Sequence, residues 1–136
     1  MIETRMAHRI VDAAQSPSGV TRPRLVLVVD RDWASVPVTL GQLLDAARDI
    51  GVEVERVKRV NGDQSIQFTG GGRIVFTTPR STPRFAVDVI VLDPSCFGHP
   101  EFLVNLAPTI ATATRPEVWT LPGPMPLAAL GTLAGG

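Results

Sequence analysis

Residues 87–93 have the sequence VDVIVLD, and the rest of the chain can be interpreted outward from them. Successive side chains of a strand point to opposite faces of the sheet, and along this stretch almost all of them are apolar. This pattern is typical of a strand inside a parallel sheet that is covered on both faces. The stretch ends on Asp93. Because open α/β sheets bind ligands at the carboxyl ends of their parallel strands, we expect this carboxylate at a ligand-binding edge.

A second apolar run, residues 25–29, predicts another buried strand, and the Asp30-Arg31-Asp32 cluster follows it directly. Leucines at helical spacing then predict a helix over residues 36–50, with Ser35 as its N-cap and Gly51 as the left-handed residue that ends it. A strand followed by a helix is a βα unit, and such units favour a parallel sheet.

The middle of the chain predicts an antiparallel meander at one edge of the sheet. Residues 52–60 form a strand pattern with charged residues on its exposed side, and Asn61-Gly62 is a strong signal for a tight turn. Two further strand patterns follow, in Ile66–Thr69 and in Gly70–Thr78 after its opening glycines. Two closely spaced prolines then exclude a central strand over residues 78–84 and indicate a loop.

Three elements complete the expected fold. Residues 3–15 have the apolar spacing of an amphipathic helix, Pro100–Leu106 predicts a short helix, and residues 117–121 predict a last strand. We therefore predict a single three-layer α/β domain over residues 1–121, with a parallel centre and an antiparallel edge meander. Within it, residues 1–23 are an N-terminal helix and linker and residues 24–121 are the core. Residues 122–136, rich in Pro, Gly and Ala, are expected to be a flexible tail.

Composition limits the function classes. Among 136 residues, 13 basic and 13 acidic side chains give a net charge of zero, so charge does not support binding to DNA or to an anionic membrane. The single cysteine, Cys96, excludes an internal disulfide, and no apolar run is long enough to span a bilayer. These features favour a protein located inside a cell, or in a particle assembled inside a cell.

Cysteine and histidine do not have the spacing of a metal site. Cys96 lies near His99, but His8 is far away in the sequence, and this set lacks the ligand spacing of zinc sites. A buried, unreactive thiol is a commoner role for a lone cysteine than nucleophilic catalysis. We expect no metal ligand among these residues.

The order of the elements resembles the middle of the ATPase domain of phage large terminase subunits, the DNA-packaging motors. In that family an Asn-Gly turn leads into a strand, followed by a glycine-rich turn with a second strand and by an arginine-containing loop. A hydrophobic strand ending in Asp-Glu, a helix, a Pro-Thr step and a final strand come next. The matching segments are Asn61-Gly62, Ile66–Thr69, Gly70–Thr78, Arg80–Arg84, Val87–Asp93, Pro100–Leu106, Pro108-Thr109 and Glu117–Leu121. The resemblance covers about three-quarters of the chain and implies a truncated P-loop-NTPase-like core.

The departures from the family bear on activity. The sequence contains no G-x-x-x-x-G-K-[ST] segment, and Lys58, its only lysine, falls in a predicted strand without a glycine loop before it. Pro94 stands where the family has the Glu that activates water, and proline cannot accept a proton. The resemblance therefore implies a degenerate domain without catalytic residues. Neither ATP nor Mg²⁺ is expected as a cofactor unless another chain completes the site.

The candidate site residues are Asp93 and two arginines of the loop over residues 78–84, Arg80 and Arg84. Asp93 is either a Mg²⁺ ligand or a relic that accepts hydrogen bonds from a neighbouring loop, and without a phosphate-binding loop we favour the relic. Arg80 and Arg84 flank two prolines and are candidates for contact with an anion or an acidic partner, against the alternative of a solvated loop.

We therefore expect a non-catalytic, terminase-like phage protein that binds packaging or virion proteins, with a homo-oligomer through a free sheet edge as a further expectation. Two alternatives remain open. One is a structural or assembly protein of the virion. The other is half of a split packaging ATPase, in which a second chain supplies the phosphate-binding loop.

Overall fold

The computed structural model describes residues 2–15, 24–60, 62–81, 83, 85–113 and 116–121, and the structural statements below concern these residues. The tail expected over residues 122–136, most of the expected linker, and Arg84 lie outside the described residues. The division into one domain and a tail therefore stays a prediction.

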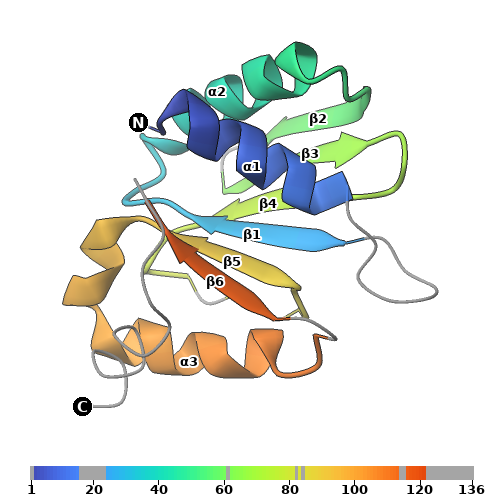
Figure 1. Ribbon diagram of the computed structural model, residues 1–136. Helices are drawn as coiled ribbons and strands as arrows, with labels where there is room; N and C mark the ends of the chain where they lie inside the picture. The colour runs from blue at the N-terminus through green and yellow to red at the C-terminus, as the bar shows by residue number, and fades with distance from the viewer. Residues whose placement is uncertain are drawn as a thin grey trace.

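A six-stranded mixed sheet forms the middle layer, in the order β2-β3-β4-β1-β5-β6 (Figure 1). Strands β4, β1, β5 and β6 run parallel to one another. Strand β3 is antiparallel to both of its neighbours, β2 and β4. This arrangement confirms the predicted parallel centre and antiparallel edge meander. The strands are β1 (Leu25–Val29), β2 (Val54–Val60), β3 (Asp63–Phe68), β4 (Arg73–Thr77), β5 (Val89–Leu92) and β6 (Glu117–Thr120).

Helices cover both faces of the sheet, which confirms the predicted three layers. Helices α1 (Thr4–Gln15) and α2 (Val36–Asp49) lie on one face, and α3 (Pro100–Ile110) lies on the other (Figure 1). A short 3₁₀ helix, η1 (Pro94–Gly98), precedes α3. No helix of the described residues is long and apolar enough to span a membrane.

Each face of the sheet has its own apolar core. The alternation of side chains along β1 divides them, because Val26 and Val28 pack toward α1 and α2 while Leu27 and Val29 pack toward α3. The α1–α2 core also contains apolar residues of both helices, and Trp33 and Trp119 pack partly buried against it. Burial of this apolar surface provides most of the favourable free energy of folding.

Strand β5 lies between β1 and β6, inside the parallel part of the sheet. It is shorter than residues 87–93, because Val87 and Asp88 precede the strand and Asp93 follows it. Asp88 is only 1% exposed, and its carboxylate accepts a hydrogen bond of 2.8 Å from the backbone N–H of Leu25. A charged residue is tolerated within this apolar stretch because it satisfies a backbone donor at the start of β1.

The two predicted ends of α2 had different outcomes. Gly51 has a φ of 75°, which confirms the predicted left-handed residue at the end of α2. Ile50, just before it, is 39% exposed and does not pack into the core with the apolar residues of the helix. Ser35 is the N-cap residue, as predicted, but its side chain makes no capping hydrogen bond. Its hydroxyl donates to Asp32 Oδ1 over 2.8 Å.

Helix α3 continues beyond its predicted end. The sequence placed Pro108-Thr109 after the helix, but both residues lie inside it. The side chain of Thr109 donates to the carbonyl of Leu106 over 2.5 Å, and the carbonyl of Thr109 accepts from the N–H of Val87 over 2.7 Å. These contacts and the burial of Leu106 and Thr109 offset the backbone hydrogen bond that proline cannot donate.

Candidate functional site

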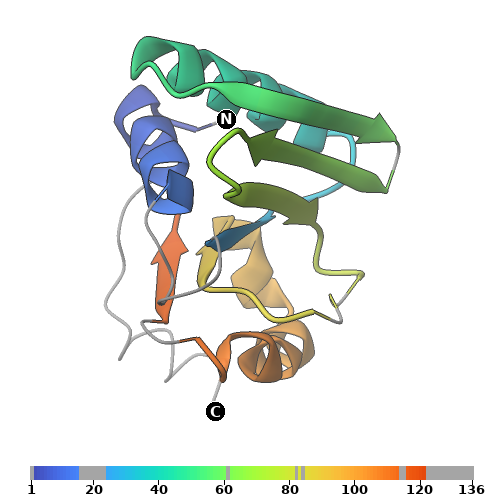
Figure 2. The ribbon, with the colours of Figure 1, turned by 90° about the vertical axis from the view of Figure 1, so that its right-hand side faces the viewer.

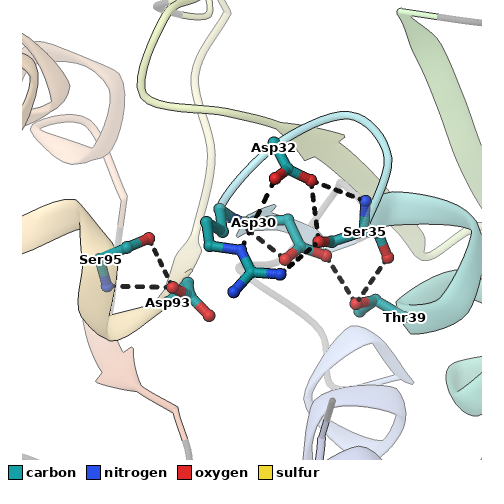
Figure 3. Close-up of polar contacts among 7 residues, drawn as sticks. Asp30, Asp32, Ser35, Thr39, Asp93 and Ser95 are labelled. Atoms are coloured by element: carbon teal, nitrogen blue, oxygen red, sulfur yellow. Dashed lines mark hydrogen bonds and ion pairs between the residues drawn. The ribbon is translucent and has the colours of Figure 1, made fainter.

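The carboxyl ends of β1 and β5 bring Asp30 and Asp93 to the same edge of the sheet (Figure 3). Val29 and Leu92 are register partners in the parallel pair, and the N–H of Asp93 donates to the carbonyl of Val29 over 2.9 Å. Parallel pairing thus gathers two carboxylates that lie more than sixty residues apart in the sequence.

Asp30 is buried and both of its carboxylate oxygens are used. It is 5% exposed, Oδ1 accepts from the N–H of Arg31 over 2.9 Å, and Oδ2 accepts from the hydroxyl of Thr39 over 2.6 Å. These contacts join the end of β1 to the first turn of α2. Asp30 therefore serves to hold the two elements together and offers no open oxygen for a ligand.

Asp32 belongs to the exposed loop between β1 and α2. Its Oδ1 accepts from both the N–H and the hydroxyl of Ser35, over 2.9 and 2.8 Å, and Arg31 Nε lies 3.6 Å from Oδ2. The hydrogen bonds from Ser35 are the largest cause that lowers the pKa of this carboxyl below its ordinary value. Asp30 and Asp32 thus have different partners but belong to one network, because Arg31 contacts both carboxylates.

Asp93 is half-buried and forms the N-cap of η1. Its Oδ2 accepts from the N–H of Ser95 over 3.0 Å and from the Ser95 hydroxyl over 2.5 Å (Figure 3). Oδ1 makes no hydrogen bond to another described side chain. The carboxylate thus acts as a local cap through Oδ2, and its Oδ1 has no side-chain partner within the described residues.

Sequence reasoning missed the partners of these carboxylates. Thr39 lies on α2, and only its position in the first turn after a strand-ending Asp signalled that its hydroxyl faces Asp30. Ser95 was noted as a neighbour of Asp93, but its double contact depends on the 3₁₀ turn that begins at Pro94.

Cys96 is completely buried beside Asp93, and its backbone N–H donates to the Asp93 carbonyl over 2.9 Å. Burial raises the pKa of the thiol to about 12, and the negative charge of Asp93 adds to this shift. A thiol with such a pKa is fully protonated at neutral pH, so Cys96 is not an activated nucleophile.

The raised pKa of Cys96 makes the stability of the protein fall at alkaline pH. In the unfolded chain the thiol loses its proton near its ordinary pKa of 9.0, whereas the folded protein retains it up to about 12. Between these values the free energy of unfolding decreases with rising pH, by at most about 1.4 kcal/mol per pH unit. We expect urea titrations at pH 8 to 11 to show this decline, and Cys96→Ala to remove it. Equal slopes in both proteins would contradict the assignment.

The other candidates do not gather at Asp93. Arg80 is exposed in the loop after β4, and its N–H lies 3.4 Å from Thr78 Oγ1. His8 contacts Asp49 over 3.2 Å between α1 and α2, while His99 follows η1. The described part of the chain contains no group of three His, Cys, Asp or Glu residues that could hold a metal ion.

The residues at this edge do not fit a Mg²⁺–nucleotide. Lys58 lies on the edge strand β2, separated from β5 by β3, β4 and β1, and its Nζ pairs with Asp63 Oδ2 over 2.9 Å. No lysine is therefore available to contact the β- and γ-phosphates beside Asp93. Pro94 follows Asp93, and Ser95 occupies one oxygen of its carboxylate.

No protein-family model matches the sequence, and no curated protein is similar to it at a significant level. Solved structures do share its fold. The large terminase of a thermophilic bacteriophage matches 85% of this chain with a TM-score of 0.58 and 13% sequence identity. The fold is terminase-like.

A second crystal form of the same phage terminase, solved in complex with ADP, also matches 85% of this chain, with a TM-score of 0.56 and 16% identity. In both comparisons the chain spans only 29% of the length of the terminase. The similarity thus concerns the fold of the α/β sheet, and identity this low does not transfer an activity.

Proposed function

We propose that this chain is a non-catalytic, terminase-like phage protein that acts as a binding or accessory factor in DNA packaging. The terminase-like fold supports the phage context. The observation that carries the non-catalytic role is the state of Asp93. Ser95 occupies one of its oxygens, Pro94 follows it, and the sequence has no G-x-x-x-x-G-K-[ST] loop. Its partners would be packaging or virion proteins in the host cytoplasm or in the particle.

Binding to packaging proteins can be tested directly. The chain, purified at full length, is mixed with the packaging proteins encoded beside it, including a large terminase, and analysed by size-exclusion chromatography with light scattering. We expect co-elution at a defined stoichiometry in the absence of nucleotide. Separate elution from every packaging protein would overturn the proposed role.

The isolated chain is expected to hydrolyse no ATP, because it offers neither a phosphate-contacting lysine nor a base beside Asp93. Phosphate release is measured with Mg²⁺ present, and Asp93→Ala serves as the matched variant. Both proteins should remain at the background rate. Magnesium-dependent turnover that Asp93→Ala abolishes would refute the non-catalytic role.

The split ATPase is a second candidate, and the available Oδ1 of Asp93 at the carboxyl end of β5 favours it. In that arrangement a second chain carrying a phosphate-binding loop would complete a Mg²⁺–ATP site. Turnover that requires both chains and is lost with Asp93→Ala would support this candidate against the accessory role.

A further inference from the structure

One face of the meander β2–β3–β4 adjoins a groove whose lining does not include Asp93. Helices α1 and α2 cover the opposite face, and α3 packs against the β1 and β5 side chains of this face. Among the described residues, the chain between β4 and β5 contains no helix, and a loop follows β4 there (Figure 2). This part of the sheet therefore lacks the helical layer that covers the rest.

The groove has a volume of about 390 Å³, within the usual range of ligand pockets. Its apolar lining comes from Leu25, Trp33, Val75, Phe76, Pro83 and Phe85, of which Val75 and Phe76 are themselves buried. Phe85 is 46% exposed, one of the few large apolar side chains left open to solvent among the described residues. A ring exposed beside a groove provides a contact area for an incoming apolar side chain.

The loop beside the groove is fixed at both ends. Near β4, the hydroxyl of Thr77 donates to the carbonyl of Ser81 over 2.6 Å, and the N–H of Ser81 donates to the carbonyl of Thr78 over 3.0 Å. Near β5, the N–H of Val87 donates to the carbonyl of Thr109 over 2.7 Å.

The strand register places two arginines on this face, one on each side of Gln67. Arg56 is paired with Gln67, and Gln67 with Arg73, so their side chains form a row across β2, β3 and β4. Both arginines are exposed, and neither has an ion-pair partner within the described part of the chain. Arg73 also lines the groove.

Acidic groups on the same face argue against a phosphate backbone as the ligand. Asp63 lies on β3 and pairs with Lys58, and the Glu55 carboxylate lies 3.5 Å from the amide of Gln67. The surface thus carries both signs of charge beside an apolar lining, and the chain has no net charge. A polynucleotide needs a stronger positive field, whereas an amphipathic protein segment needs only local charge complementarity.

We propose that this groove binds an acidic, amphipathic segment of a partner protein. A large apolar side chain of that segment packs against Phe85, and its carboxylates pair with Arg73 and Arg56. The inference rests on the proposed role as a binding factor, because it identifies the surface through which a partner attaches.

The test is a selection of random 16-residue peptides displayed on particles against the full chain, followed by affinity measurements on synthetic peptides by fluorescence anisotropy. We expect the enriched peptides to combine Asp or Glu with a large apolar residue. Phe85→Ser and Arg73→Glu should each weaken binding at least tenfold. The matched controls Val38→Ser and Arg48→Glu alter residues on α2 that are 56% and 80% exposed, and they should leave the affinity unchanged.

Failure to enrich peptides, enrichment without acidic residues, or affinities insensitive to both groove variants would overturn the proposal. Tighter binding of a single-stranded oligonucleotide that Arg73→Glu abolishes would also overturn it and would assign the face to nucleic acid. The ATP hydrolysis assay is independent of these results. A failed peptide selection therefore leaves the absence of catalysis standing, and ATP turnover would overturn the proposed function without affecting the groove.

Discussion

Gly72→Ala is expected to destabilise the protein by roughly 3 kcal/mol, at the upper end of the costs measured for overpacking. An ideal Cβ at position 72 would lie 1.9 Å from the carbonyl oxygen of Ala14 and 2.9 Å from its carbonyl carbon. Both are backbone atoms in the last turn of α1, so no side-chain rotation can relieve the contact. The carbonyl of Gly72 also accepts from the N–H of Phe68 over 2.9 Å, which restrains the hairpin from moving away.

Equilibrium unfolding in urea measures this loss, and Gly70→Ala provides the control. Gly70 lies in the same turn, but a Cβ there would have no atom within 4 Å. Its substitution should change the free energy of unfolding by no more than about 0.5 kcal/mol. Equal unfolding midpoints for the two variants would contradict the close packing of α1 against the β3–β4 turn.

Thr39→Val is expected to cost about 1.5–3 kcal/mol, the typical value of a hydrogen bond to a charged group. The Thr39 hydroxyl donates to Asp30 Oδ2 over 2.6 Å, and both residues are buried. Valine has nearly the same shape but no donor, so the carboxylate would keep only its bond from the N–H of Arg31. The loss follows from leaving a buried carboxylate oxygen without a partner.

Thr39→Ser separates the hydrogen bond from the packing, because serine retains the hydroxyl and loses only a methyl group. Thermal and urea unfolding should place this variant much closer to the original protein than Thr39→Val. If Thr39→Val unfolds at the same urea concentration as the original protein, the hydrogen bond to Asp30 does not stabilise this site.

The sequence was informative where burial and periodicity act together. The apolar run before Asp93 predicted a central parallel strand, and β5 pairs on both sides in the parallel part of the sheet. Glycine and charge patterns predicted the meander, because an edge strand such as β2 tolerates charged residues on an exposed face. These features depend on short stretches and are therefore visible without coordinates.

The rest depends on contacts between distant segments. Ser35 is the N-cap of α2, but its hydroxyl contacts Asp32, and this loop contact was not visible in the sequence. Pro108 lies inside α3, where Thr109 and Leu106 are buried. The hydrogen bond from Thr39 to Asp30 depends on how α2 packs beside β1. The row of Arg56, Gln67 and Arg73 depends on the pairing register of β2, β3 and β4. Arg84 lies outside the described residues, so its predicted contact with an anion stays a prediction.

The central claim is that a terminase-like sheet retains the aspartate after β5 without retaining nucleotide binding. Isothermal titration calorimetry of the purified chain with Mg²⁺–ATP tests this claim most directly, with Asp93→Ala titrated in parallel. We predict no saturable heat for either protein up to millimolar nucleotide, because Ser95 holds the Asp93 carboxylate and no lysine lies beside it. A micromolar dissociation constant that disappears in Asp93→Ala would contradict the claim.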